Sequence, residues 1–152
     1  MADIVFNIAK GRVAEFYVRV DGNDPANAVF QIVPIDAGAT TDATFRDHDA
    51  LSNVLAAATE RTTGGWNRKT LTDTELVAFA PDDTNDRADL DFPDQTWTAV
   101  SAGVTTDLVV SYDSDSTAGT DANQVPCTLH DFAITPDGSD VVAQINVFFR
   151  AS

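Results

Sequence analysis

Residues 106–112 have the sequence TDLVVSY, a short segment that is apolar along most of its length. A continuous apolar run of this length is typical of a strand with both faces buried, so we expect it to lie centrally in a sheet. The polar loop 113–124 follows it and leads to CTLHDFAIT (127–135), which also predicts a strand. The second half of the chain is therefore expected to be mainly β.

Alternating or continuous apolar patterns elsewhere predict further strands, about eight in all. In 16–20 the period of two places Tyr17 and Arg19 outward, and in 28–36 Pro34 favours a sheet edge or a strand end. The loop 80–86 is rich in turn residues and predicts a hairpin connection. The predicted strands are 3–9, 16–20, 28–36, 69–79, 87–98, 106–112, 127–135 and 141–149.

One helix is predicted, at about 47–61, where apolar residues recur with helical spacing. Asp47 is placed to cap its start and Arg61 to complement the dipole at its end. A chain of 152 residues is long enough for one domain, which we take as 1–152. The predicted fold class is mainly β: a single-domain β-barrel or sandwich of about eight strands with one inserted helix.

The composition is strongly acidic. There are 24 Asp and Glu residues against 9 Lys and Arg, a formal net charge of −15. Repulsion among this many like charges destabilises a compact chain in dilute buffer. In concentrated salt the repulsion is screened, because the Debye length falls to about 3 Å at 1 M. This excess of acidic residues favours a protein that works in high salt. The alternative is an ordinary protein whose acidic surface keeps it soluble. Nucleic acid is not an expected partner, because too few cations are available to displace counterions.

The single cysteine, Cys127, excludes an intramolecular disulfide and a cysteine-based zinc site. The sequence shows neither a signal peptide nor an apolar run long enough to span a bilayer, so we expect no membrane partner and synthesis in a cytoplasm. GGWNRKT (64–70) is not a phosphate loop, since Arg68 stands where that motif needs glycine. We interpret this segment as a connection from helix to strand, with Trp66 packed inward or offered to a partner.

DSDSTAGTDAN (113–123) suggests a calcium loop but lacks the glycine and glutamate positions of an EF-hand. A looser calcium site would use Asp113, Asp115 and Asp121. The alternative is a solvated loop whose side chains cap their own backbone, and we predict no resident metal or other cofactor.

We find no pattern that predicts an enzyme. His130 and Asp131 are neighbours in a predicted strand and should face opposite ways, as should Cys127 and His130, so neither pair forms a dyad. His48 is expected at the surface. The acidic residues between 82 and 94 are interpreted as an exposed hairpin face rather than a pair of catalytic carboxylates.

The chain ends with VVAQINVFFRAS (141–152). Phe148 and Phe149 point in opposite directions in a strand, so at most one of them belongs to the chain's own core. Phenylalanine and arginine are enriched in interface cores, and we therefore predict that Phe148, Phe149 and Arg150 anchor a partner. Trp66 and Tyr112 are weaker anchor candidates. The alternative is that the second phenylalanine simply lies on a sheet surface.

Three segments together resemble a family of short head-associated virion proteins of tailed viruses: MADIVFNIAKGRV (1–13), DDTNDRADLDFPDQTWTAV (82–100) and CTLHDFAITPDGSDVVAQINVFFRAS (127–152). The resemblance rests on overall pattern and not on a diagnostic motif. It implies a capsid decoration (cement) protein on the virion surface, with the major capsid protein as partner and a homo-oligomer, favoured as a trimer. The acidic composition then implies a virus of a halophilic host.

Two other classes of protein remain open from the sequence. One is another virion part, such as a tail, connector or receptor-binding component. The other is a cellular calcium-dependent binding module built on the loop 113–124.

Overall fold

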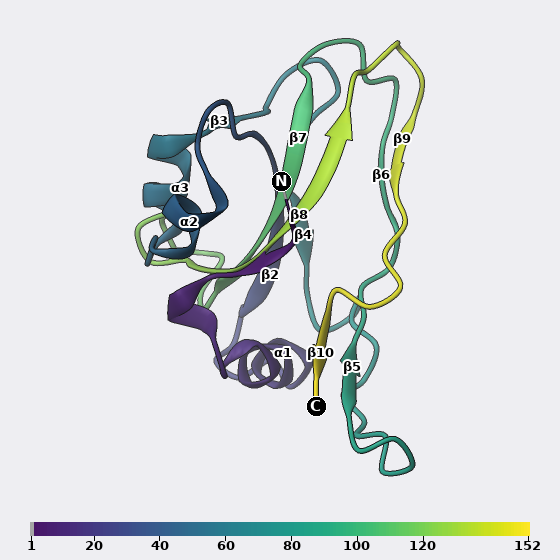
Figure 1. Cartoon of the computed structure of the whole chain (residues 1–152). Coiled ribbons are helices and arrows are strands. Elements are labelled where there is room, and N and C mark those ends of the chain that lie inside the picture. Colours follow the sequence, from purple (N-terminus) through teal and green to yellow (C-terminus); the bar gives the residue numbers. More distant parts are fainter. Residues whose placement is uncertain (1) are drawn as a thin grey trace.

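The computed structural model describes residues 2–152, and its centre is one antiparallel sheet with strand order β1-β8-β7-β2-β3 (Figure 1). The strand β4 also pairs with β2, on the same side as β3. The predicted central strand is confirmed, because β7 lies between β8 and β2. The strands of this sheet are β1 (Ile4–Val5), β2 (Val29–Asp36), β3 (Thr59–Glu60), β4 (Lys69–Leu71), β7 (Thr105–Asp113) and β8 (Val125–Ile134).

Two short antiparallel ribbons lie beside this sheet (Figure 1). The first pairs β5 (Ala88–Leu90) with β10 (Phe149–Ala151), and the second pairs β6 (Gln95–Trp97) with β9 (Val141–Ala143). The fold is therefore mainly β with antiparallel sheets, as predicted. The layering is consistent with a sandwich, and the strands do not close into a barrel.

The two faces of the central sheet bury different cores. Phe30 and Ile32 of β2 face the ribbons, while Val33 and Ile35 face a pair of helices. Along β7 the same alternation holds, with Val109 on the helix side and its two neighbours on the ribbon side. A strand that buries both faces needs apolar residues in succession, which explains the continuous apolar run in β7.

The segment predicted as the strand 16–20 is instead a helix, α1 (Val13–Asp21). Its buried residues are Val13, Phe16, Tyr17 and Val20, which share one helical face. Val18 is 46% exposed and Tyr17 is buried, the reverse of what a period of two requires. The ion pair between Glu15 and Arg19, four residues apart at 2.9 Å, supports the helix.

The helix predicted at 47–61 is shorter, α3 (Leu51–Ala57), and a second short helix that was not predicted, α2 (Asp42–Arg46), precedes it. The end of the predicted range is the strand β3, and Arg61 pairs with Asp36 instead of lying at a helix end. Thr41 caps α2 by accepting a hydrogen bond from the Thr44 amide, and Asp47 lies at the end of α2 rather than at a helix start. No side chain caps α3. Its first amides, those of Leu51 and Ser52, donate to the carbonyls of Gln124 and Asp121. A loop 70 residues away in sequence therefore caps this helix, so local sequence could not reveal where it begins.

Several predicted strands are shorter than expected or are paired differently. The segment 3–9 contains β1 and then a 3-10 helix, η1 (Asn7–Ala9). β4 and β5 do not form a hairpin, since β4 joins β2 and β5 joins β10. The predicted last strand 141–149 is divided into β9 and β10. In all, residues 2–152 contain ten strands and three α-helices rather than about eight strands and one helix.

Pro34 lies inside β2, which is a central strand, so the predicted sheet edge is wrong. Its carbonyl accepts a hydrogen bond from the Arg61 amide, on the side where β2 meets β3 and β4. The paired residues of β2 on that side are 30–32 and 35–36, which leaves Pro34 opposite the break between the two strands. A proline can occupy this position because no ladder hydrogen bond is required of its nitrogen.

The core on the ribbon side is largely aromatic, and Phe148 lies within it. Its ring stacks on Phe92 at a centroid distance of 3.9 Å and lies 5.9 Å from Phe30 and 6.1 Å from Tyr17. Phe149 on β10 is only half-buried. The expectation that at most one of the two phenylalanines belongs to the core agrees with this arrangement.

We expect Phe148→Ala to lower the free energy of unfolding by about 3–5 kcal/mol, because it leaves a cavity beside Phe92. Phe149→Ala removes a half-buried ring from the neighbouring position and should cost about 1 kcal/mol. Chemical denaturation of both variants measures the difference. Equal losses would contradict the placement of Phe148 in the core.

Candidate functional site

The structure separates the five predicted interface residues into two groups. Phe148, Trp66 and Tyr112 are buried, with exposed fractions of 7%, 2% and 6%. They are not available as surface anchors, and that prediction is corrected for all three. On β10, Phe149 is half-buried and Arg150 is exposed, and Arg150 forms an ion pair with Asp89 of β5 at 2.5 Å.

Trp66 and Tyr112 are held by contacts within the chain. The indole of Trp66 donates to the carbonyl of Gly103 at 2.8 Å, and its ring lies 5.2 Å from that of Trp97. Tyr112 stacks on Phe16 of α1 at 4.4 Å. Of the two alternatives for Trp66, the structure supports the one in which it packs inward.

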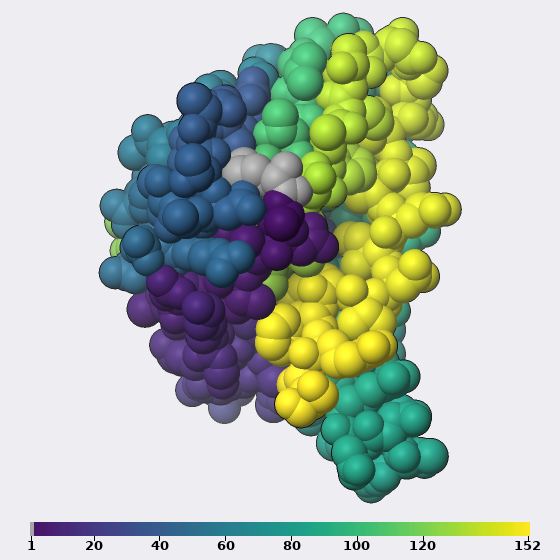
Figure 2. Space-filling model, viewed as in Figure 1, coloured from purple at the N-terminus to yellow at the C-terminus, as the bar shows by residue number. Residues whose placement is uncertain are grey.

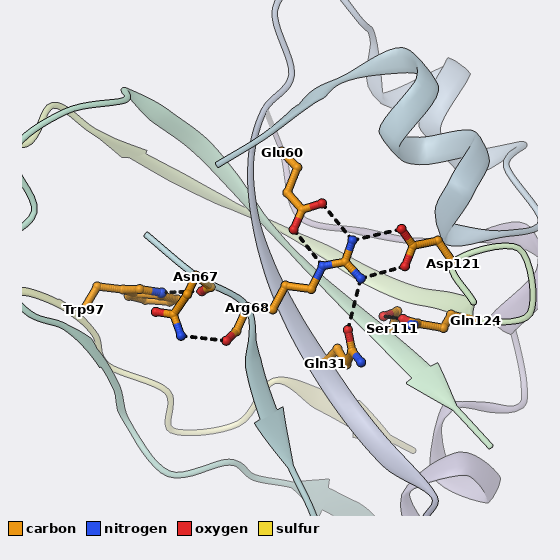
Figure 3. Close-up of polar contacts among 8 residues, drawn as sticks. All are labelled: Gln31, Glu60, Asn67, Arg68, Trp97, Ser111, Asp121 and Gln124. Carbon is orange, nitrogen blue, oxygen red and sulfur yellow. Dashed lines mark hydrogen bonds and ion pairs between the residues drawn. The ribbon is translucent and has the colours of Figure 1, made fainter. Parts of the chain in front are cut away.

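Arg68 is the centre of a network of partly buried charges (Figure 3). Its guanidinium donates to both carboxylate oxygens of Glu60 on β3, each at 2.7 Å. It also donates to both oxygens of Asp121 in the loop 114–124, at 2.6 and 2.9 Å. A longer contact of 3.3 Å reaches the side-chain oxygen of Gln31 on β2.

This network connects the loop 114–124 to β2 and β3, because Arg68 contacts Gln31 and Glu60 as well as Asp121. The hydrogen bonds from Arg68 lower the pKa of Asp121 and raise that of Arg68 itself, so both groups stay charged. Next to them the Ser111 hydroxyl donates to the side chain of Gln124 at 2.9 Å (Figure 3). The segment suspected of resembling a phosphate loop thus supplies a structural arginine.

The predicted calcium residues are not brought together. Asp121 is bound to Arg68, while Asp113 accepts a hydrogen bond from the Asp115 amide at 3.0 Å and Asp115 accepts from Thr117. The Asp113 carboxylate also packs so closely on Gly119 that a Cβ there would lie 2.5 Å from it. Within residues 2–152, no three His, Cys, Asp or Glu side chains are placed to hold a metal ion. The loop instead caps its own backbone, as in the alternative interpretation.

His130 contacts Asp3 near the start of the chain rather than a nucleophile. Its Nδ1 lies 3.5 Å from the Asp3 carboxylate and its Nε2 lies 2.9 Å from the Thr128 hydroxyl. Burial lowers the pKa of His130, against the opposing effect of Asp3. Cys127 is fully buried, and burial raises the pKa of its thiol to about 12, which suppresses the thiolate. The Asp3 contact joins residues 127 positions apart, and no local pattern could have predicted it.

The acidic segment around 80–88 forms a projection that stands away from the rest of the molecule beside β5 and β10 (Figures 1 and 2). Asp82 closes its base through backbone hydrogen bonds with Arg87, at 2.8 and 3.3 Å. The Asp82 carboxylate also accepts from the side chain of Asn85 at 2.7 Å. Asp83 and Asp86 are exposed at its end, as predicted for an acidic loop face. Arg87 pairs with Asp89 at 3.1 Å, which continues the charged row to Arg150.

Asp107 on β7 is a fully buried carboxyl group that the sequence analysis did not single out. The Thr106 hydroxyl donates to its Oδ2 at 2.6 Å, while its Oδ1 is buried and has no hydrogen-bond partner. Burial raises the pKa of Asp107 against the opposing effect of the Thr106 hydrogen bond, and the charges of Asp131 and Asp42 add to the rise. Its position in a continuous apolar strand was the available signal, because an ionisable residue there must be buried.

Comparison of the chain with models of known protein families, with curated proteins and with solved structures found no match. The resemblance to head-associated virion proteins therefore stays a prediction. No helix among residues 2–152 is long and apolar enough to cross a membrane.

We expect Arg68→Met to lower the free energy of unfolding by about 2–3 kcal/mol, because it leaves two partly buried carboxylates unpaired. The stabilisation should be present above about pH 4 and lost as the pH falls through the lowered pKa of Asp121. Denaturation curves from pH 2 to 8 measure both effects. Arg46→Met, at an exposed arginine of α2, is the matched control and should change stability by less than about 0.5 kcal/mol. An equal loss in both variants would show that Arg68 acts only through net charge.

We expect Asp107→Asn to stabilise the chain by about 1–2 kcal/mol at pH 7, because the ionised carboxylate is penalised by burial. In the native chain this group's contribution is present below the unfolded pKa of about 4 and is lost as the pH rises through its raised folded pKa. The gain should therefore shrink as the pH is lowered to 4. Thermal unfolding at several pH values checks this, with exposed Asp73→Asn as control. A gain that does not depend on pH would contradict the explanation.

Proposed function

We propose that this chain is a structural protein of a tailed-virus particle that decorates the outer face of the major capsid lattice as a cement protein. The sequence support is its resemblance, over three segments, to head-associated virion proteins. We further propose that it assembles as a homo-oligomer, with a trimer favoured, and that its layered sheets form a β-sandwich that carries the contact surface at one end.

The observation that carries this proposal is the acidic projection formed by residues 80–88 beside β10. The side chain of Arg150, which is 49% exposed, is fixed by Asp89 across the ribbon, so the projection and the C-terminal strand form one braced surface. A surface whose side chains are already held in place loses little conformational entropy on binding. With Phe148, Trp66 and Tyr112 in the core, we assign the contact to this surface and to Phe149 and Arg150.

The charge of the chain also suits a part that is made in many copies. A net charge of −15 keeps free copies apart in solution. A small contact, repeated wherever an oligomer meets neighbouring capsid subunits, then gains affinity through effective concentration. The acidic end of the projection favours a basic groove on the lattice, which would set orientation and the rate of association.

The direct test is cryo-electron microscopy of purified particles of the presumed virus, imaged in high salt. Density on the outer capsid with residues 80–88 and 149–152 at the contact would support the proposal. Density confined to the tail or portal would make the chain a tail or connector component. Particles without the chain would exclude a virion role.

A variant of the projection tests the contact surface itself. The double variant Asp83→Asn, Asp86→Asn should weaken binding to particles stripped of the chain by about tenfold at low salt, through loss of charge complementarity. Asn tolerates the left-handed backbone of Asp86, whose φ is 51°, so the fold should persist. The control Asp49→Asn, Asp73→Asn has the same change of net charge elsewhere on the surface. Sedimentation with particles measures occupancy, and equal binding by both variants would remove the projection from the contact.

A further inference from the structure

Residues 77–81, with the sequence VAFAP, are five successive apolar residues that the fold leaves largely at the surface. Val77 has the largest exposed fraction of any large apolar residue in the described part of the chain, at 61%. Its four neighbours in the segment are also exposed, apart from the half-buried Phe79. Single exposed apolar residues are ordinary on a protein surface, whereas a contiguous run of them marks a candidate contact with a partner.

The helix α1, which lies next to β5 (Figure 1), holds this segment in place through two side chains. The Tyr17 hydroxyl donates to the carbonyls of Val77 and Asp91, at 2.6 and 2.9 Å. One turn later on α1, the Asp21 carboxylate accepts a hydrogen bond from the Phe79 amide at 3.1 Å. Burial raises the pKa of Tyr17 to about 12, so its hydroxyl keeps the proton that it donates. The segment is therefore positioned without belonging to a sheet, and a partner need not order it.

The segment is extended, because its two ends are held at the two ends of β5. At one end the Tyr17 hydroxyl joins Val77 to Asp91, and at the other end Asp82 forms backbone hydrogen bonds with Arg87. The side of this frame that contains β5 crosses about 13 Å in four residue steps, at the rise of a strand. The opposite side crosses the same distance in five steps of about 2.6 Å, which is far from the rise of about 1.5 Å in a helix.

One edge of this extended segment has backbone groups without a partner in the chain. The N–H and C=O groups of successive residues in an extended chain point to opposite sides. The carbonyl of Val77 and the amide of Phe79 are directed to α1, so the groups of Ala78 and Ala80 point away from it. Within residues 2–152, the backbone of Ala78 and Ala80 forms no hydrogen bond. An edge of this kind is a template for a further strand.

Charges at the two ends of the segment decide between a second copy of this chain and a different partner. Glu75 lies two residues before the segment and Asp83 two residues after it. Hydrogen bonds from Thr72 lower the pKa of Glu75, which keeps it negative. If two copies paired in antiparallel fashion with Ala78 opposite Ala80, Glu75 of each copy would lie opposite Asp83 of the other. Like charges in that position are destabilising, whereas a strand with a cation at each end is complementary.

We propose that residues 77–81 bind an extended segment of another protein as an added β-strand, one with apolar residues at its centre and Lys or Arg at both ends. The backbone groups of Ala78 and Ala80 form the ladder, and Val77 contacts the apolar centre of the partner. Main-chain pairing supplies the affinity, while the charges of Glu75 and Asp83 select the partner. This inference does not rest on the proposed virion role, because it specifies the chemistry of a partner segment and is tested without a virus particle.

The test titrates the full chain with the blocked peptide Lys-Lys-Val-Thr-Val-Thr-Val-Lys-Lys and follows the backbone amides by NMR. We expect shifts in 77–81 and slower hydrogen exchange of the Ala78 and Ala80 amides, because both become hydrogen-bonded. The same peptide with its five central amides methylated keeps every side chain but cannot form a ladder, and it should bind about tenfold more weakly or less. A peptide with Glu in place of each Lys should be weakened by a similar factor at low salt.

Variants place the peptide on this segment. Val77→Lys brings a cation to the proposed contact and should weaken binding of the basic peptide by about tenfold. Val142→Lys makes the same change on β9, at a valine that is 48% exposed, and should have a much smaller effect. Near-UV circular dichroism confirms that both variants are folded. Absence of binding by the basic peptide, equal affinity for its methylated form, shifts that map away from 77–81, or equal effects of the two variants would each overturn the proposal.

Discussion

The antiparallel ladder between β2 and β7 is the constraint on which the other elements depend. It registers seven residues of each strand, from Val29 opposite Asp113 to Ile35 opposite Asp107. Because side chains alternate across a strand, this one register assigns every residue to either the helix-side core or the ribbon-side core. A slip of one residue would exchange Val33 and Ile35 with Phe30 and Ile32. Phe30 and Ile32 would then face α2 and α3, and neither core would pack.

Arg68 links the loop 114–124 to this sheet. The loop 114–124 supplies Asp121 to the guanidinium and also caps α3 with the carbonyls of Asp121 and Gln124. One residue of this loop therefore orients a helix and balances a cation at the same time. Asp121, which the sequence suggested as a calcium ligand, is instead paired with Arg68 within the chain.

Sequence patterns predicted those strands in which the local hydrophobic pattern agrees with the tertiary packing. The strands β2, β7 and β8 were predicted closely, because continuous burial leaves a continuous apolar run. The strand predicted in place of α1 was wrong because Phe16, Val18 and Val20 fit a period of two. Only tertiary packing shows that Tyr17 is buried and Val18 is not. Three of the predicted interface residues, Phe148, Trp66 and Tyr112, were wrong for a related reason. The sequence pattern around a large aromatic residue is the same whether the residue packs in its own core or against another protein.

The distribution of the cations bears on what the chain can bind. It has seven arginines, and among residues 2–152 six of them, all except Arg46, form ion pairs with carboxylates. Most of the positive charges are thus paired within the chain, and the 24 carboxylates outnumber the 9 Lys and Arg residues. Repulsion among those carboxylates is relieved either by dissolved salt or by cationic groups of a partner.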